Sequence, residues 1–193
     1  MLRIVAGQFG GRRIQAPAGR RTRPTAEKVR AALFNALHQW LSLGGARVLD
    51  LYAGSGALGI EALSRGAAQV TFVESDPRSA ALVRANLKSL GVPAGQATVV
   101  RGKALPWLRQ ATAALDMQLV LLDPPYAAGE YESVLQALAQ WRGLAPEGII
   151  AVEAPARQDV AAPPGLAVLR TKRYGDTQLV YLGKAAREAA SAP

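Results

Sequence analysis

Short, continuous apolar runs alternate along the chain with longer segments whose apolar residues recur at helical spacing. Runs that fit buried strands cover residues 47–54, 69–76, 97–104, 117–126 and 148–155. Helical segments follow the first four runs, at residues 55–66, 77–90, 105–114 and 130–144. Strands that alternate with helices predict a parallel, doubly wound sheet that binds its ligands at the carboxyl ends of the strands.

Two further segments flank this alternation. Residues 166–175 and 177–184 are predicted strands joined by a tight Gly-Asp turn, so we expect them to pair antiparallel. Residues 3–17 predict a β-hairpin around two glycines, and residues 25–41 predict a helix with Thr25 as its N-cap. We therefore expect an α/β, Rossmann-like fold. Its seven-stranded sheet is mostly parallel with an antiparallel last strand, and it carries an N-terminal hairpin and helix extension.

Composition narrows the protein class. Of 193 residues, 50% are hydrophobic and 19% are charged, which is typical of a globular domain. There is no cysteine and a single histidine, His38, so we expect no metal centre. No apolar run approaches the roughly 20 residues of a membrane helix. The first 11 residues lack the apolar core of a signal peptide, so we expect a cytoplasmic protein.

The positive charge is concentrated at one end of the chain. The net charge is +9, and residues 1–30 carry +7 of it, from eight Lys or Arg and one Glu. The remaining residues carry 15 basic and 13 acidic side chains. Such clustering predicts an arm that binds a polyanion, and nucleic acid is the favoured partner.

A glycine-rich loop, DLYAGSGALG, follows the first strand at residues 50–59. It satisfies G-x-G-x-x-G, and Glu74 ends the next strand 18 residues past Gly56, as in a dinucleotide-binding oxidoreductase. However, Asp50 would repel a pyrophosphate and suits a cationic ligand, such as the amino-acid end of S-adenosylmethionine. Glu74 can accept hydrogen bonds from both ribose hydroxyls of either cofactor.

The fourth strand ends in Asp-Pro-Pro-Tyr, residues 123–126. If this strand lies beside the first, the motif faces the glycine loop. The Asp123 carboxylate and the Pro124 carbonyl can then accept the two hydrogens of a nucleobase amino group and aim its lone pair at a methyl donor. Pro125 stiffens the turn, and Tyr126 can stack on the base for roughly 1–3 kcal/mol. The motif therefore predicts methyl transfer to an exocyclic nitrogen.

With these motifs, the chain resembles class I S-adenosylmethionine-dependent methyltransferases that carry the [DN]PP[YF] motif. It more closely resembles the RsmD-type 16S ribosomal RNA guanine-N2 methyltransferases. The most specific feature is RPT followed by VR-x-x-LFN upstream of DLYAGSG. The matching stretches are RIVAGQFGGRRI, TRPTAEKVRAALFNAL, VLDLYAGSGALGIEALSRGA, VTFVESD and LVLLDPPY.

The resemblance implies a methyltransferase that uses S-adenosylmethionine on the N2 atom of a guanine in small-subunit ribosomal RNA, free or in an assembling subunit. It implies an RNA-contacting extension at residues 1–43, a methyltransferase domain at 44–184 and a flexible tail at 185–193, in a monomer. The implied target-binding residues are Asp123, Pro124, Pro125 and Tyr126. The implied cofactor site comprises Asp50, Leu51, Tyr52, Ala53, Gly54, Gly56, Glu74, Ser75, Lys103 and Ala104. The implied RNA-binding residues are Arg3, Arg12, Arg13, Arg20, Arg21, Arg23 and Thr25.

Two positions depart from the family pattern. Lys103 stands where members usually carry Asp or Asn, so our hypothesis is that the backbone around residues 102–104 reads the adenine. Gly10 stands where the hairpin turn typically has an arginine. The first alternative function is an adenine-N6 methyltransferase acting on DNA or RNA through the same motif. A dehydrogenase and a non-catalytic RNA-binding protein are more distant alternatives.

Overall fold

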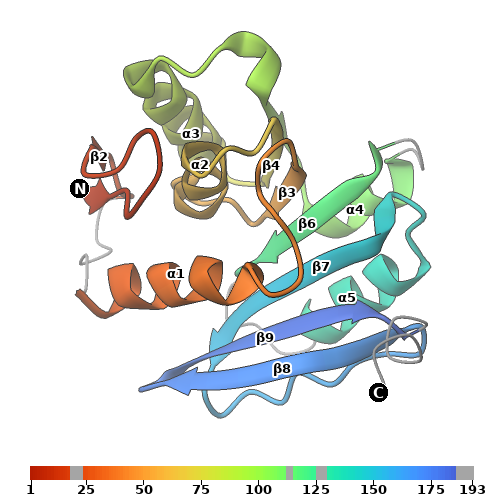
Figure 1. Ribbon diagram of the computed structural model, residues 1–193. Coiled ribbons are helices and arrows are strands. Elements are labelled where there is room, and N and C mark those ends of the chain that lie inside the picture. The colour runs from red at the N-terminus through yellow and green to blue at the C-terminus, as the bar shows by residue number, and fades with distance from the viewer. Residues whose placement is uncertain (18–23, 112–114, 125–129, 186–193) are drawn as a thin grey trace.

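A seven-stranded sheet forms the centre of the protein (Figure 1), in a computed structural model that describes residues 1–17, 24–111, 115–124 and 130–185. The strand order is β5-β4-β3-β6-β7-β9-β8. Strands β3 to β7 are parallel, and β9 runs antiparallel to both of its neighbours, β7 and β8. The predicted α/β sheet with an antiparallel last strand is therefore confirmed. The strands are β3 (Arg47–Leu51), β4 (Gln69–Glu74), β5 (Ala97–Arg101), β6 (Met117–Leu122), β7 (Leu144–Pro155), β8 (Leu166–Tyr174) and β9 (Thr177–Lys184).

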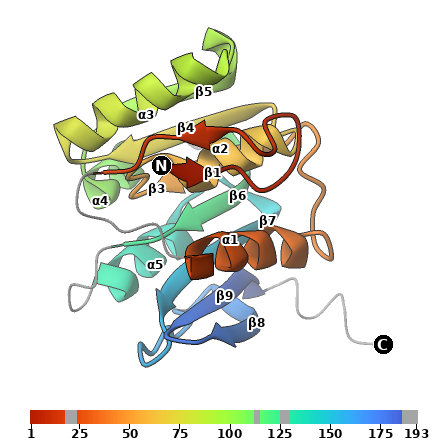
Figure 2. The same cartoon turned by 90° about the vertical axis from the view of Figure 1, so that its left-hand side faces the viewer.

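Helices connect the strands, and a short hairpin precedes them. The hairpin pairs β1 (Leu2–Arg3) with β2 (Arg13–Ile14) in antiparallel register. The helices are α1 (Pro24–Leu37), α2 (Ala57–Ser64), α3 (Pro77–Leu90), α4 (Ala104–Gln110), α5 (Glu130–Gln140) and the 3-10 turn η1 (Ala94–Gln96). Figure 2 shows α1 between the β1–β2 hairpin and the β8–β9 pair. Within the described ranges, no helix combines the length and the apolar character needed to cross a membrane.

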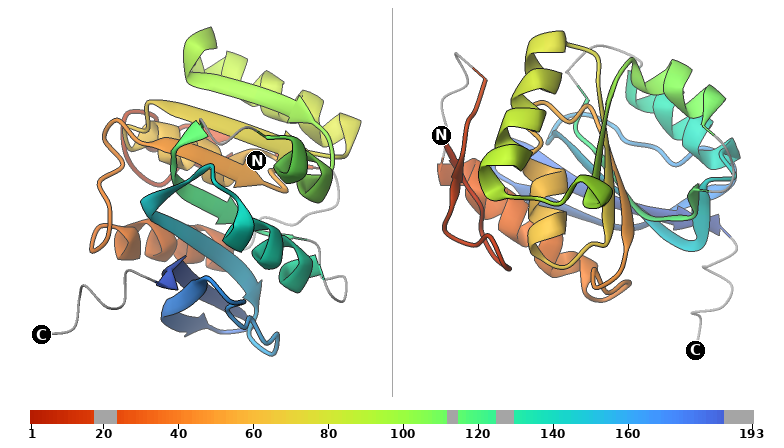
Figure 3. Two further views of the ribbon diagram at one scale, coloured as in Figure 1. Left: turned by 90° about the vertical axis from the view of Figure 1, so that its right-hand side faces the viewer. Right: turned by 90° about the horizontal axis from the view of Figure 1, so that it is seen from above.

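The helices cover the sheet on both faces. Helices α1, α2 and α3 lie on one face, and α4 and α5 lie on the other (Figure 3, right). The alternation along β6 shows why both faces are apolar. Leu119 and Leu121 belong to the core under α1 and α2, whereas Val120 and Leu122 belong to the core under α4 and α5.

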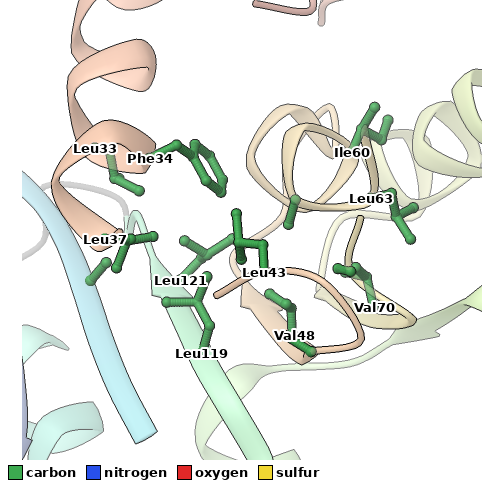
Figure 4. Packing of buried hydrophobic residues seen from close by; sticks show 14 of the residues in the cluster. Leu33, Phe34, Leu37, Leu43, Val48, Ile60, Leu63, Val70, Leu119 and Leu121 are labelled. Atoms are coloured by element: carbon green, nitrogen blue, oxygen red, sulfur yellow. The ribbon is translucent and has the colours of Figure 1, made fainter. Parts of the chain in front are cut away.

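The core on the α1 face joins the N-terminal extension to the sheet. Leu33 and Leu37 of α1 approach Leu119 and Leu121 of β6 (Figure 4). Ile4, Phe9 and Ile14 of the hairpin segment are buried in the same cluster, with at most 9% of each residue exposed. The extension therefore shares a hydrophobic core with the sheet.

Several predicted boundaries shift. Helix α3 begins and ends as predicted, with Asp76 accepting a 2.7 Å hydrogen bond from Ser79 N and Gly91 at φ +72°. The prediction that Thr25 caps α1 is wrong, because α1 begins at Pro24, a residue type favoured in the first helical turn. Strand β7 begins at Leu144, earlier than predicted, because Leu144 pairs with Met117 before a register shift in the ladder.

Candidate active site

A cavity of about 560 Å³ opens beside the carboxyl ends of β3, β4, β5 and β6. Its volume lies within the range of small-molecule binding sites. Seven of the predicted site residues line it: Tyr52, Gly54, Glu74, Ser75, Lys103, Ala104 and Asp123. The other lining residues are Pro17, Val73, Ser79, Gly102, Leu105, Pro106 and Glu130. The structure therefore brings the glycine loop and the start of the Asp-Pro-Pro-Tyr motif to one cavity.

Glu74 ends β4 with its carboxylate held in a fixed position. Oε2 accepts a 2.8 Å hydrogen bond from Gly54 N, and Oε1 accepts a 2.8 Å hydrogen bond from Asp76 N. A carboxylate has about four lone-pair sites, so each oxygen can accept a further hydrogen bond. Gly54 has a φ of +57°, a conformation that favours glycine. The glycine loop therefore helps to orient the two carboxylate oxygens of Glu74, which can accept further hydrogen bonds at the end of β4.

Asp50 lies behind this cavity and not in its lining. Its side chain is buried, and Oδ2 accepts a 2.9 Å hydrogen bond from Gly59 N in the first turn of α2. Burial raises the pKa of Asp50 to about 7, and the charges of Asp123 and Glu74 add to the shift. The first N–H groups of a helix have no partner within the helix, and the N-cap residue of α2, Gly56, has no side chain that could accept a hydrogen bond from them. The Asp50 carboxylate supplies this acceptor. Leu51, Ala53 and Gly56 also lie outside the lining residues.

Tyr52 and Glu130 face the cavity and contact each other. The Tyr52 hydroxyl donates a 2.9 Å hydrogen bond to Glu130 Oε1. Burial and the Glu130 carboxylate raise the pKa of Tyr52, so the hydroxyl stays a donor across the neutral pH range. Glu130 was not predicted as a site residue; its only signal in the sequence is its place at the start of the helix that follows the Asp-Pro-Pro-Tyr motif.

Asp123 and Pro124 directly follow β6. Because Leu51 of β3 pairs with Leu122 of β6, Tyr52 and Asp123 are the first residues beyond two paired strand ends. The Tyr131 hydroxyl, which is buried, lies 3.4 Å from the Pro124 carbonyl and 3.4 Å from the Glu153 carbonyl, and can donate to either. The buried Tyr131 hydroxyl therefore helps to fix the position of the Pro124 carbonyl. Pro125 and Tyr126 fall outside the described residues.

The remaining wall comes from β4 and α4. Gly102 N donates a 2.9 Å hydrogen bond to Glu74 O, which fixes the turn into α4. Lys103 occupies the N-cap position of α4 without a side-chain capping bond, and its side chain is exposed. Val73, Leu105 and Pro106 give this wall an apolar surface. Leu105 and Pro106 belong to none of the motifs, and Val73 precedes Glu74 within an apolar strand, so none of the three was predicted as a site residue.

The charges of the lining residues favour a cationic ligand. Glu74, Asp123 and Glu130 are acidic, whereas Lys103 is the one base among the described residues that line the cavity. A ligand with positive charge would offset the repulsion between these carboxylates. Within the described ranges, no group of His, Cys, Asp or Glu side chains has the arrangement of a metal site.

The predicted RNA-binding residues lie in several environments. Arg3 and Arg13 are exposed on the hairpin. Arg12 is exposed but donates hydrogen bonds of 3.0 and 2.7 Å to the carbonyls of Leu90 and Ser89, at the end of α3. Thr25 lies in the first turn of α1. Arg20, Arg21 and Arg23 fall outside the described residues.

The fold and the cavity define a class. The strand order with one antiparallel strand, and a cavity that joins the glycine loop to Asp123, are those of a Rossmann-like class I methyltransferase. A protein from Escherichia coli, yhhF, described as a candidate methyltransferase, superposes with a TM-score of 0.81 at 34% identity, over 95% of this chain and 98% of that one. Hypothetical protein TTHA0928 of Thermus thermophilus superposes with a TM-score of 0.79 at 28% identity, over 96% and 100%.

Sequence comparison gives the family. Residues 2–183 match the family described as conserved hypothetical protein 95, and the chain belongs to it. The chain is 34% identical to ribosomal RNA small subunit methyltransferase D of Haemophilus influenzae, over 90% of this chain and 89% of that protein. It is 38% identical to the protein of the same name from Escherichia coli, over 84% and 79%. The predicted RsmD-type family is therefore confirmed.

Proposed function

We propose that this protein transfers the methyl group of S-adenosylmethionine to the exocyclic N2 atom of a guanine in small-subunit ribosomal RNA. The observation that carries the proposal is the single cavity into which Glu74, at the end of β4, and Asp123, after β6, both open. The ribosomal RNA substrate is inferred from the relatives' names. The N2 atom is inferred from the Asp-Pro-Pro-Tyr motif and the family resemblance.

The residues of the cavity fit this cofactor. Glu74 offers two oriented oxygens to the ribose hydroxyls, and Val73, Leu105 and Pro106 offer an apolar surface to the adenine. The acidic lining suits the cationic amino acid and sulfonium groups. The cofactor supplies an electrophilic methyl group. Asp50 acts from behind the cavity, by holding the glycine loop against α2.

Asp123 and Pro124 hold the target nitrogen. The amino group of guanine is a poor nucleophile, because its lone pair is delocalised into the ring. The Asp123 carboxylate and the Pro124 carbonyl each accept one of its hydrogens, which orients the lone pair towards the methyl group. Tyr131 keeps the Pro124 carbonyl in place, and Asp123 accepts the proton that the nitrogen releases. Pro125 and Tyr126 complete this site, with Tyr126 stacking on the base.

The other expectations from sequence belong to the same proposal. Residues 1–43 contact RNA and residues 44–184 carry out methyl transfer. The predicted tail, residues 185–193, lies outside the described residues except for Ala185. The target guanine leaves its stack to reach Asp123, which costs least in an RNA loop. The protein acts as a monomer in the cytoplasm, on ribosomal RNA or on the assembling small subunit.

Substitution of Asp123 tests this assignment. We expect Asp123→Ala to lower transfer of labelled methyl to undermethylated small subunits by about 100-fold or more. The dissociation constant for S-adenosylhomocysteine, measured by calorimetry, should change less than about threefold, because Asp123 faces the target and not the ribose. Asp159→Ala removes the same charge from an exposed loop and should leave both quantities unchanged. Full activity of Asp123→Ala would contradict the assignment.

A further inference from the structure

The outer strand of the sheet, β8, is strongly basic. It pairs with β9 and carries Arg170, Lys172 and Arg173, all exposed, with no acidic residue between Leu166 and Tyr174. Exposed basic side chains on an edge strand discourage pairing with another strand. Three of them on a strand that carries no acidic residue also give this strand a positive potential. Glu153 of β7, which opposes Leu179, is the acid on the same face across β9 from Lys172.

The register of β8 assigns these side chains to faces of the sheet. Residues that oppose each other in an antiparallel pair project from the same face. Arg170 opposes Tyr181 and Lys172 opposes Leu179, and both of these β9 residues are buried in the core under α1. Arg173 opposes Gln178 and therefore projects from the other face. Arg170 and Lys172 thus share the α1 face of the sheet.

Helix α1 links this strand to the N-terminal hairpin. The Tyr181 hydroxyl of β9 donates a 3.2 Å hydrogen bond to Leu33 O of α1, and the Tyr181 and Trp40 rings lie 5.0 Å apart. The hairpin, with exposed Arg3 and Arg13, lies on the opposite side of α1 from the β8–β9 pair (Figure 2). Basic side chains therefore flank α1 on both sides.

The direction of β8 brings its basic end to the edge of the sheet that holds the cavity. Since β9 is antiparallel to both β7 and β8, β8 runs in the same direction as β7 and the other parallel strands. Lys172 consequently lies near the edge at which β3, β4 and β6 end. Arg157, just after β7, is exposed at this edge, and Ala156 N donates a 2.8 Å hydrogen bond to Asp176 O in the β8–β9 turn.

We propose that Arg170 and Lys172 form a second RNA-binding surface, which we call the β8 surface, across α1 from the hairpin. This inference rests on the proposed function. Phosphate contacts on both flanks would hold the RNA backbone while one nucleotide enters the cavity. The Lys172 ammonium lies 5.4 Å from the centre of the Tyr174 ring, a contact that orients it without removing its charge.

The composition of the β8 surface favours RNA over a protein. Among the residues that the structure describes, the large apolar side chains that are exposed are Met1 and Val168, so β8 offers one such residue. A stable protein interface has an apolar core, whereas a phosphate backbone needs separated positive charges.

The test compares two double variants of equal charge. Arg170→Ala/Lys172→Ala removes the β8 surface. Arg109→Ala/Arg142→Ala removes two exposed arginines, one at the end of α4 and one between α5 and β7. Both lie where β6 and β7 begin, at the end of the parallel strands opposite to the cavity. Affinity for naked small-subunit RNA is measured as a function of salt. We expect the first variant to bind roughly tenfold more weakly and its salt slope to fall by about 2, one per lost phosphate contact.

The kinetic readout separates binding from chemistry. We expect Arg170→Ala/Lys172→Ala to raise the KM for RNA with little change in kcat, and Arg109→Ala/Arg142→Ala to change neither. Arg173→Ala removes one charge from the other face of the same strand and should have the smaller effect.

Three results would overturn the inference. One is the same salt slope for the two double variants. Another is an effect of Arg173→Ala equal to that of the double variant. The last is a loss seen with assembled subunits but not with naked RNA, which would indicate a protein contact. Failure of the unaltered protein to methylate either substrate would instead contradict the proposed function.

Discussion

The Tyr52 hydroxyl lies 2.9 Å from Glu130 Oε1, so a hydrogen bond joins the loop after β3 to the first residue of α5. The two ends of this bond belong to the two halves of the proposed site, because Tyr52 lies in the glycine loop and Glu130 follows the Asp-Pro-Pro-Tyr motif. Tyr52 also has a φ of +61°, which is rare for an aromatic residue. A strained backbone of this kind persists when its surroundings hold it in place.

We expect Tyr52→Phe to lower the free energy of unfolding by about 1 kcal/mol and to slow methyl transfer several-fold, because the ring remains but the bond is lost. Glu130→Ala should have a similar effect. In a double-mutant cycle read by urea denaturation, the two changes should couple by about 1 kcal/mol. Glu130→Gln keeps an acceptor oxygen and should retain most of the activity. Strict additivity of the two changes would show that the bond contributes nothing.

A second prediction concerns Glu61, a fully buried carboxylate on α2. It accepts hydrogen bonds from the backbone of Val5 at 2.8 Å and of Ala6 at 3.1 Å, and it pairs with Arg65 at 2.8 Å. Glu61→Ala would remove the acceptor of these two N–H groups and of Arg65. It would also remove the negative charge that lies 3.7 Å from the Nε atom of buried Arg30. We expect a loss of about 3–5 kcal/mol in the free energy of unfolding.

The same variant should release the N-terminal hairpin before the sheet unfolds. Hydrogen exchange at residues 4–12 should accelerate far more than exchange in β3 and β6. Glu61→Gln keeps one acceptor oxygen and should have an intermediate effect. Uniform acceleration across the chain would show that Glu61 stabilises the whole fold and does not specifically hold the hairpin.

A third prediction follows from the pKa of Asp50, which burial raises to about 7. An Asp in the unfolded chain ionises near its ordinary pKa of 3.8, so between pH 4 and 7 the folded state binds more protons than the unfolded state. The contribution of Asp50 to stability is therefore largest below pH 4, decreases as pH rises to about 7 and is constant above that. Asp50→Asn keeps an acceptor for Gly59 N but cannot ionise.

We expect the free energy of unfolding of Asp50→Asn, relative to the unaltered protein, to rise steadily from pH 4 to 7 and then to level off. Urea denaturation at four or five pH values measures this difference. A difference that is independent of pH would show that Asp50 ionises at its ordinary pKa in the folded protein.

A fourth prediction concerns Lys103, the N-cap residue of α4 that makes no capping bond. An aspartate there can accept hydrogen bonds from the free N–H groups of the first helical turn, which is worth about 1 kcal/mol of stability. If the backbone reads the adenine, Lys103→Asp should also tighten S-adenosylhomocysteine binding, since a carboxylate can accept the adenine amino hydrogens. Lys103→Ala serves as the control, because it removes the charge without adding an acceptor. A large loss of affinity in Lys103→Asp would show that the lysine itself binds the cofactor.

The centre of the fold was predictable because β3 and β6 are buried on both faces. An almost continuous apolar run such as residues 117–122 is easily recognised as a buried strand. The ends of α3 are equally recognisable, because Asp76, Pro77 and Gly91 are residue types that begin or end helices through local contacts. The boundaries that moved depend on distant partners. Strand β7 begins earlier than predicted because Leu144 pairs with Met117, a residue far from it in sequence.

The lining of the cavity was predictable where a motif coincides with a strand end, as at Glu74 and Asp123. It was not predictable where a side chain acts through a tertiary contact. Asp50 has the motif position of a cofactor ligand, yet its carboxylate accepts from Gly59 N behind the cavity. Glu130 and Tyr131 follow the motif with no recognisable pattern, and only the folded chain shows that they contact Tyr52 and Pro124.

The most direct test is the transfer of labelled methyl from S-adenosylmethionine to three acceptors, with the modified nucleoside identified by mass spectrometry. The acceptors are undermethylated small ribosomal subunits, naked small-subunit RNA and duplex DNA. We predict N2-methylguanosine in one or both RNA samples and no product in DNA. N6-methyladenine in DNA would contradict the assigned target, and the absence of product in all three would contradict the proposed function.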